Sequence, residues 1–401
     1  MLISNPHAMH APYPAKLQAI MSIERAGESR HWLSSWPGVA GPTPLRELPD
    51  LASKLQVARL SVKDESLRSP LGSFKALGAP IALVRQILRL HPGFRPGDIL
   101  AGRHADALAD YTVITATDGN HGRSLAAAAR DAGCRCVIVL HAHVSREREQ
   151  AIAAHGARIV RIAGNYDASV EEAARLAAAN GWQVISDTSY EGYQDIPRDV
   201  MQGYGTIAAE VTEQTGAQRD DCAYTHVFLQ GGVGGLAAGV ASWLWEYHDA
   251  ARPGFIVVEP EQADCLLQSA LQGAPARATG SVDSVMAGLA CGETSPLAWR
   301  FLDPGIDHFM TIADDEAIEA MRTLARGSER DPPIVAGESG AAGLAALQAL
   351  RRDTTLSVRA GLGPHSRVLV INTEGATDPW MYEKLVGASP VAVAKRGHTH
   401  A

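Results

Sequence analysis

Short runs rich in Val and Ile alternate with longer alanine-rich runs in the middle of this chain, and this alternation constrains its fold more than any other feature. We expect strands at 112–115, 136–140, 158–162 and 183–186, separated by helices at 120–131, 145–155 and 168–180. Ser145 precedes one of these helices in the position of an N-cap, and glycines follow them. Strands that alternate with helices usually pair in parallel, so the pattern predicts a parallel sheet covered by helices.

A second series of strands and helices extends the α/β pattern toward the end of the chain. Further strands are expected at 225–229, 255–258 and 367–371, and further helices at 201–215, 263–271, 314–326 and 340–350. We interpret 111–202 as a small α/β domain inserted into a large domain built from 1–110 and 203–401. Residues 90–110 are rich in Gly, Pro and polar side chains, so we expect them to run over the surface between the two domains.

Length and charge exclude several classes of protein. A chain of 401 residues corresponds to about two to three domains. Its net charge is −8 and it has no basic block, which argues against nucleic acid as the main partner. We expect no membrane span and no secretory signal, because apolar runs are short throughout and the first twenty residues contain no apolar segment. Five cysteines form no disulfide framework, so we expect a cytoplasmic protein. With nucleic acid and membrane excluded, the expected partner is a small molecule.

A lysine among apolar and small residues is the first candidate for chemistry. Lys75 lies in the segment 73–78, Ser-Phe-Lys-Ala-Leu-Gly. Apolar surroundings remove water from an amine, lower its pKa and leave it free to attack a carbonyl. Most isolated lysines are solvated surface residues, so this segment alone is weak evidence for a catalytic site.

A polar turn, Thr-Asp-Gly-Asn-His-Gly-Arg at 117–123, joins an expected strand to an expected helix. Amides at a helix N-terminus favour oxygen or anionic ligands, and ligands of open α/β sheets bind at the carboxyl ends of strands. A turn that only caps the helix would also use Asp and Asn. The surplus of polar side chains favours a binding site, in which we expect His121 to be a structural residue.

A glycine-rich loop follows Gln230 between another strand and helix, and it consists of Gly231, Gly232, Val233, Gly234 and Gly235. Glycines let the backbone approach an anion closely, so we predict a phosphate site here. Gly232 and Gly234 with Ala237 also resemble a dinucleotide-binding fingerprint, and Glu259 follows about 25 residues later. An NAD-dependent dehydrogenase is the alternative that this second pattern suggests.

The last expected strand ends in Ile-Asn-Thr-Glu-Gly at 371–375. A hydroxyl or acid at this position could reach a ring nitrogen or a substrate. The other interpretation is an ordinary junction between a strand and a turn.

Taken in this order, the lysine, the asparagine turn, the glycine loop and the late hydroxyl resemble the fold-type-II pyridoxal 5′-phosphate enzymes, which include threonine and serine dehydratases and tryptophan synthase β. Within this group the chain is most similar to the diaminopropionate ammonia-lyase family, over about 42–378. The similar stretches are 63–66, 116–123, 187–193, 201–204, 258–265, 286–293, 337–341 and 373–375. Asp118 matters most, since ordinary dehydratases have Ser-Ser-Gly-Asn-His where this chain has Thr-Asp-Gly-Asn-His.

The resemblance implies a fold, a cofactor and residues that hold it. The implied fold is a homodimer of chains with two open, twisted, mostly parallel sheets covered by helices and an active site in the cleft between domains. The implied cofactor is pyridoxal 5′-phosphate, with Lys75 bound to it covalently, Asn120 at its ring oxygen and Thr373 facing its pyridine nitrogen. Its phosphate would lie on the loop made of Gly231, Gly232, Val233, Gly234 and Gly235.

The implied reaction is β-elimination of 2,3-diaminopropionate to pyruvate and two molecules of ammonia. By resemblance, Lys75 removes the Cα proton of one enantiomer and Asp118 that of the other, so both enantiomers are substrates. Asp187 is expected to receive the cationic β-amine, an ion pair that a hydroxyl substrate could not make. The group that protonates the departing amine is left open.

Some residues depart from the family pattern. Gly72-Ser73 stands where Asn-Ala is usual, Ser189-Tyr190 where Ala-Trp is usual, and Asn372 where Ser is usual. The first two pairs flank expected substrate residues, so a pyridoxal-phosphate-dependent dehydratase or lyase of serine, threonine or a β-N-substituted alanine stays the main alternative. A β-replacement synthase and a non-catalytic binding protein are further alternatives.

Cysteine and histidine add little to this assignment. Cys265 and Cys291 both lie in stretches that resemble the family, so they either approach each other or are two ordinary buried thiols. A reducing cytoplasm favours the second interpretation. The histidines form no cluster with the spacing of metal ligands, and we expect no metal site.

Overall fold

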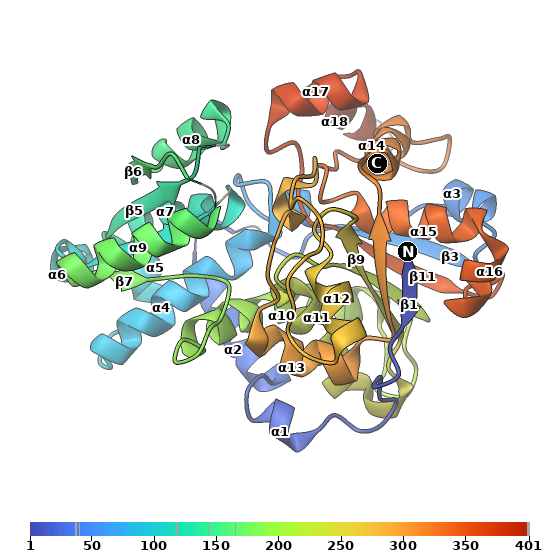
Figure 1. Cartoon of the computed structure of the whole chain (residues 1–401), viewed down its shortest axis with the longest axis horizontal. Helices are drawn as coiled ribbons and strands as arrows, with labels where there is room; N and C mark the ends of the chain where they lie inside the picture. The colour runs from blue at the N-terminus through green and yellow to red at the C-terminus, as the bar shows by residue number, and fades with distance from the viewer. Residues whose placement is uncertain (37, 40, 118, 143, 165, 399–401) are drawn as a thin grey trace.

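The computed structural model describes residues 1–36, 38–39, 41–117, 119–142, 144–164 and 166–398. The chain forms one four-stranded and one seven-stranded sheet, which Figure 1 shows in a smaller lobe at the left and a larger lobe at the right. Helices cover both sheets. The predicted α/β class with two mostly parallel sheets is therefore confirmed.

The four-stranded sheet is parallel throughout and has the order β6-β5-β4-β7. Its strands are β4 (Thr112–Ala116), β5 (Arg135–Leu140), β6 (Arg158–Arg161) and β7 (Gln183–Val184), and its helices are α7 (Asn120–Ala132), α8 (Arg146–Ala153) and α9 (Tyr166–Asn180). Ser145 caps α8 as predicted, since its hydroxyl accepts a hydrogen bond from the Arg148 amide. Gly133 ends α7 in the left-handed conformation, with φ = +83°.

The seven-stranded sheet has the order β1-β10-β9-β8-β11-β3-β2, with antiparallel strands only at its two edges. Its strands are β1 (Leu2–Ser4), β2 (Leu45–Glu47), β3 (Arg59–Asp64), β8 (His226–Gln230), β9 (Gly254–Pro260), β10 (His308–Ile312) and β11 (Arg367–Asn372). Alternate residues of β8 belong to different cores: Val227 and Leu229 to one, Phe228 to the other. Burial on both faces explains why three consecutive residues of this strand are apolar.

The helices of the larger lobe lie on both faces of this sheet (Figure 1). They are α1 (Ala15–Gln18), α2 (Ile23–Leu33), α3 (Pro49–Lys54), α10 (Asp195–Thr215), α11 (Gly235–His248), α12 (Cys265–Gln272), α13 (Pro296–Gly305), α14 (Asp314–Arg326), α15 (Ala342–Arg352), α16 (Thr354–Arg359), α17 (Pro379–Val386) and α18 (Pro390–His398). In the described part of the chain, every helix is too short or too polar to cross a membrane.

Residues 90–110 lie mostly at the surface, as expected, but they also form short helices. They follow α4 (Ala79–Leu90) and form α5 (Pro96–Leu100) and α6 (Ala105–Leu108). Ile99 and Leu100 of α5, which contacts α4 and α7, and Leu108 of α6 are buried in the main core. These three apolar side chains anchor an otherwise exposed segment. The division into a domain 111–202 and a domain of 1–110 with 203–401 stays a prediction, and α10 runs through residue 202 without a break.

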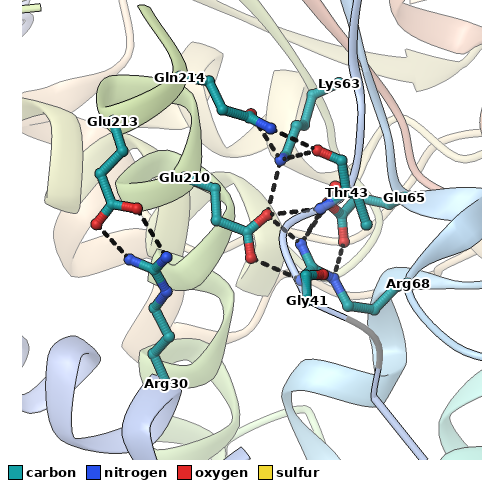
Figure 2. Close-up of polar contacts among 9 residues, drawn as sticks. All are labelled: Arg30, Gly41, Thr43, Lys63, Glu65, Arg68, Glu210, Glu213 and Gln214. Atoms are coloured by element: carbon teal, nitrogen blue, oxygen red, sulfur yellow. Dashed lines mark hydrogen bonds and ion pairs between the residues drawn. The ribbon is translucent and has the colours of Figure 1, made fainter. Parts of the chain in front are cut away.

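A network of buried charges fixes α10 against β3 (Figure 2). Lys63 on β3 and Arg68 both contact Glu210 on α10, at 2.7 Å. Arg68 also binds Glu65 at 2.8 Å, and Lys63 donates to the Thr43 carbonyl at 2.7 Å. The network holds the C-terminal half of α10 close to the segment that carries Lys75.

Candidate active site

One pocket collects the segments that the sequence singled out. It is lined by parts of the lysine segment, the asparagine turn, the glycine loop and the end of β11, together with residues 287–291 and Ser339. The predicted residues that line it are Lys75, Asn120, Asp187, Gly231, Gly232, Val233, Gly235 and Thr373. Gly234 faces the core instead, since a Cβ there would lie 2.8 Å from Leu302 Cδ1. Asp118 lies outside the described residues.

Close packing against α10 positions the lysine. Lys75 lies in a 3-10 turn, Phe74–Leu77, and its own amide donates to the Ser73 hydroxyl, which caps the turn. Gly203 of α10 packs directly on this turn, because a Cβ there would lie 1.9 Å from the Leu77 carbonyl oxygen. The next residue on α10, Tyr204, places its ring 4.8 Å from that of Phe74. Any larger residue at 203 would therefore displace the lysine segment.

The lysine amine forms an ion pair with Asp187 inside the pocket. Nζ of Lys75 lies 2.6 Å from Oδ2 of Asp187. Burial alone would lower the pKa of the Lys75 amine, as the sequence predicts, but the attraction of Asp187 reverses the direction and holds that pKa above its usual value. Burial likewise opposes ionisation of Asp187, and the charge of Lys75 nevertheless holds its pKa below the usual range. The predicted low pKa of Lys75 is therefore wrong in this arrangement.

The asparagine turn connects β4 to the N-terminus of α7. The hydroxyl of Thr117 accepts hydrogen bonds from the amides of Gly119 and Gly122, at 3.1 and 3.3 Å. The Asn120 amide donates to a carboxylate oxygen of Glu374 across the pocket. Asn120 is thus presented to the pocket by the first turn of a helix, and Glu374 is an acidic neighbour that the sequence interpretation did not assign.

The glycine loop presents a helix N-terminus to the same pocket. Gly232 and Gly234 have φ = +59° and +98°, which L-residues with side chains rarely adopt. A Cβ at Gly231 would lie 2.6 Å from Glu259 Cγ. The loop leads directly into α11, whose first amides have no partner within the helix and favour an anion. This backbone cradle fits a phosphate group.

Thr373 ties the end of β11 to the lysine segment. Its carbonyl accepts a hydrogen bond from the Phe74 amide, at 3.0 Å. Its neighbour Glu374 accepts one from the Ser339 amide, at 3.2 Å. Asn372 points away from the pocket and donates to Asp64, at 2.9 Å, and to the Val335 carbonyl. The departure at 372 is thereby explained as a structural contact between β11 and β3.

Glu259, the acid of the dinucleotide interpretation, has a structural role instead. Glu259 is fully buried and accepts hydrogen bonds from the amides of Leu266 and Leu267, both at 2.8 Å. It therefore caps α12, and it does not line the pocket as a ribose-binding acid would. Burial raises the pKa of this carboxyl to about 8.

The two family-like cysteines lie on either side of Gly232. Cys265 Sγ is 3.5 Å from the Gly232 carbonyl oxygen, and a Cβ at Gly232 would lie 3.6 Å from Cys291 Sγ. Neither cysteine is in a disulfide in this structure. Among the described residues no group of His, Cys, Asp and Glu has the arrangement of a metal site.

Several pocket residues were not found by sequence reasoning. Tyr204, Arg148 and Ser339 line the pocket from α10, α8 and the segment before α15. Tyr204 belongs to the Met-Gln-Gly-Tyr stretch at 201–204, which could have indicated it, because the stretch resembles the family. Arg148 lies within an ordinary-looking charged helix, and no sequence signal marks it.

The residues present fit one cofactor. A lysine, an anion cradle at a helix N-terminus, an amide and a hydroxyl all face one pocket, as pyridoxal phosphate requires. The family model of "Pyridoxal-phosphate dependent enzyme" matches residues 38–374 of the chain. The chain belongs to this family of pyridoxal-phosphate dependent enzymes, and the cofactor predicted from the sequence is confirmed at that level.

Relatives with a narrower description cover nearly the whole chain. Diaminopropionate ammonia-lyase of Escherichia coli (strain K12) is 38% identical over 359 residues, which are 88% of this chain and 89% of that protein. The enzyme of the same description from Salmonella typhimurium is 37% identical over 354 residues, 86% of this chain and 87% of that protein. A crystal structure of the E. coli enzyme with an aminoacrylate-PLP azomethine reaction intermediate has a TM-score of 0.86 at 35% identity and covers 96% of both chains.

Proposed function

We propose that this chain catalyses the β-elimination of 2,3-diaminopropionate, as both enantiomers, to pyruvate and two molecules of ammonia. The contact between Lys75 and Asp187 carries the proposal. It places a carboxylate 2.6 Å from the reactive amine, inside the cofactor pocket. A substrate with a second amino group can bind this carboxylate as an ammonium ion, whereas a hydroxyl group cannot form that ion pair. The similarity to diaminopropionate ammonia-lyases supports the same substrate.

Several residues would hold the cofactor. Lys75 would bind it covalently, Asn120 would bind its ring oxygen, and Thr373 would face its pyridine nitrogen. Gly231, Gly232, Val233, Gly234 and Gly235 would hold its phosphate through backbone amides at the start of α11. When bound, pyridoxal phosphate supplies an electron sink that stabilises negative charge at the substrate Cα.

Lys75 and Asp187 then act as an exchangeable pair. When the substrate ammonium binds Asp187, Lys75 loses the negative charge that keeps it protonated. Burial of the amine then favours its neutral form, which is the form that can take the Cα proton. Asp187 meanwhile orients the β-amine that must depart. Asp118 would take the Cα proton of the other enantiomer; this assignment comes from the resemblance.

The test combines absorption with a set of substrates. The purified protein, loaded with pyridoxal phosphate, is expected to show the absorption band of a lysine-bound cofactor and to release pyruvate from L- and D-2,3-diaminopropionate. L-serine, D-serine and L-threonine are measured beside them. A coloured protein that is inert on both diaminopropionates but active on a hydroxy amino acid would replace the proposal with the dehydratase alternative. A protein that binds no cofactor would contradict the catalytic assignment altogether.

Two expectations from the sequence accompany this proposal. The chain would act as a homodimer, and it would work in the cytoplasm. Both stay predictions, and sedimentation of the loaded protein checks the first.

A further inference from the structure

The side chain of His121 lies behind the catalytic pair. His121 is in the first turn of α7 and is 4% exposed. Its Nε2 lies 2.8 Å from the carbonyl oxygen of Ile185, just after β7. Because a carbonyl only accepts hydrogen bonds, Nε2 must carry the ring proton, and Nδ1 then presents a lone pair. The tautomer of this imidazole is thus set by the backbone.

The lone pair of His121 faces the oxygen that binds Lys75. Nδ1 lies 3.8 Å from Oδ2 of Asp187, and the same Oδ2 is 2.6 Å from the Lys75 amine. Nδ1 is buried and has no hydrogen-bond partner in the described part of the chain. Two acceptors therefore face each other at 3.8 Å, and a proton between them would form a hydrogen bond once the side chains approach by about 0.6–1 Å. A buried polar atom left unpaired is costly, so its position invites a functional explanation.

We propose that His121 is a positioning residue of the elimination reaction proposed above, whose Nδ1 receives a proton through Asp187 and later returns it. The C–H electron pair stays on the substrate, and the proton forms an N–H bond at Lys75. The β-amine, bound at Asp187 as an ammonium ion, departs as ammonia with the electron pair of its C–N bond and leaves the carboxylate free. Lys75 then passes its proton to Oδ2 of Asp187, and Oδ2 passes it to Nδ1 of His121. Nδ1 later returns this proton through Asp187 to the ammonia, which is released as ammonium.

The charges around His121 disfavour protonation of His121 and Lys75 at the same time. Among the described residues, the charged groups that act on the imidazole are Asp187, after β7, and Lys75, on its 3-10 turn. Burial and the positive charge of Lys75 oppose an imidazolium, while Asp187 favours it, and the pKa of His121 lies below its usual value. When Lys75 gives up its proton, its positive charge no longer opposes protonation of the imidazole. His121 therefore becomes a better proton acceptor at the step in which Lys75 passes its proton on.

The kinetic test uses His121→Gln, which keeps an amide donor for the Ile185 carbonyl but cannot titrate. His226→Gln is the matched control, since Nε2 of His226 also contacts a backbone carbonyl, that of Ala360 at 3.0 Å, while the residue lies at the start of β8. In the loaded enzyme we expect His121→Gln to lower kcat for diaminopropionate about 10- to 100-fold, with KM within about threefold. Its acid limb should move at least about one pH unit lower, because the imidazolium that blocks proton uptake no longer forms. His226→Gln should retain the wild-type profile, and a His121→Gln profile that superimposes on wild type would overturn the proposal.

A second readout requires neither turnover nor a change at residue 121. Nitrogen-15 NMR of histidine-labelled, cofactor-loaded protein reports the protonation of each imidazole. Asp187→Asn removes the charge that stabilises the imidazolium, so the titration midpoint of His121 should fall by at least about one pH unit, while that of His226 stays in place. An unchanged or higher midpoint at His121 would contradict the relay. If the wild type releases no pyruvate from diaminopropionate, the proposed function is wrong, and this midpoint still decides whether Asp187 stabilises a protonated His121.

Discussion

Two lysine–carboxylate pairs of this protein have nearly the same length and very different surroundings. Lys63 lies 2.7 Å from Glu210, and Lys75 lies 2.6 Å from Asp187. The side chains of the first pair are 0% and 3% exposed, and those of the second 20% and 18%. The first pair is closed off from solvent, whereas the second lies in the pocket.

The two pairs also differ in how completely they are satisfied. The Lys63 amine has three acceptors, from Thr43, Glu210 and Gln214, and Glu210 also binds Arg68 (Figure 2). Beside the second pair, Nδ1 of His121 and the hydroxyl of Tyr204 are buried without a hydrogen-bond partner among the described residues. We call an ion pair saturated when the polar atoms around it all have hydrogen-bond partners. A saturated pair stabilises one structure, while a pair with unpaired neighbours can exchange partners.

The largest effect is expected from Lys75→Met, which breaks the pair in the pocket. The covalent attachment of the cofactor is lost, so the absorption band of the lysine-bound cofactor should disappear and turnover should fall about 10⁴-fold or more. The free energy of unfolding should change less than for a fully buried pair, since the two side chains are 20% and 18% exposed. Lys54→Met, at an exposed position on α3, is the control that should keep band and turnover. Elimination at the wild-type rate in Lys75→Met would contradict the assignment of Lys75.

The saturated pair should respond in the opposite way. Glu210→Gln leaves Lys63 and Arg68 buried without their shared carboxylate, so the free energy of unfolding should fall by about 3–5 kcal/mol. Turnover per folded molecule should stay within about twofold of wild type. Urea denaturation followed by circular dichroism measures the first quantity, and pyruvate release at low temperature the second.

Glu213→Gln supplies the matched control for Glu210→Gln. Glu213 lies on the same helix and binds Arg30 at 2.7 Å, but its side chain is 59% exposed. Exposed ion pairs contribute little, so this variant should lose at most about 1 kcal/mol. Equal losses in the two variants would show that burial of the network is not what stabilises α10.

The difference between local patterns and long-range contacts explains which parts of the molecule could be predicted from sequence. The strands of the small sheet and the four segments of the pocket were predicted, because a parallel strand buried on both faces and a glycine loop before a helix have strong local patterns. Strand β3 was not, since it contains Lys63, whose burial is possible only because Glu210 lies opposite it, 147 residues further along the chain. The start of α10 at Asp195 was also missed, as was the short helical structure within 90–110.

The identities of the pocket residues could be predicted from the sequence, but the contacts between them could not. The sequence indicated Lys75, Asn120, the glycine loop and Thr373, because each of them lies in a segment with a local pattern. It could not indicate that Asp187 would reverse the pKa shift of Lys75, because that depends on a contact between residues 112 positions apart. The unpaired Nδ1 of His121 likewise follows from the Ile185 carbonyl and is invisible in the sequence.

Asp187→Asn sharpens the comparison inside the pocket. It replaces an ion pair to the substrate ammonium with a neutral contact, so kcat/KM for diaminopropionate should fall about 10²-fold. Activity on serine, if any, should fall less, because serine loses only the proton relay through Asp187, whereas diaminopropionate loses the ion pair as well. Steady-state pyruvate release on both substrates measures the difference, and equal losses on the two would contradict the role of Asp187 in recognising the amine.

Asp118→Asn tests the proposed second base. Turnover of D-2,3-diaminopropionate should fall about 30-fold, while turnover of the L-enantiomer should fall about threefold or less. Parallel kinetics on the two pure enantiomers give this ratio. Equal losses on both would refute the idea that Lys75 and Asp118 serve opposite faces of the substrate.

The smallest effect concerns the acid stability of the saturated pair. Burial opposes ionisation of Glu210, but Arg68 and Lys63 outweigh it and hold the pKa of Glu210 below its usual value of 4.5. A carboxyl whose pKa is lowered by folding stabilises the protein fully above the unfolded pKa, and this contribution disappears as the pH falls toward the folded pKa. Between about pH 4.5 and 3, wild type should therefore lose stability more steeply than Glu210→Gln, by at most about 1.4 kcal/mol per pH unit. Urea midpoints of the two proteins over this range measure the difference. Parallel slopes would mean that Glu210 titrates alike in the folded and unfolded chains, and the contrast between a saturated and an exchangeable pair would then lose its electrostatic basis.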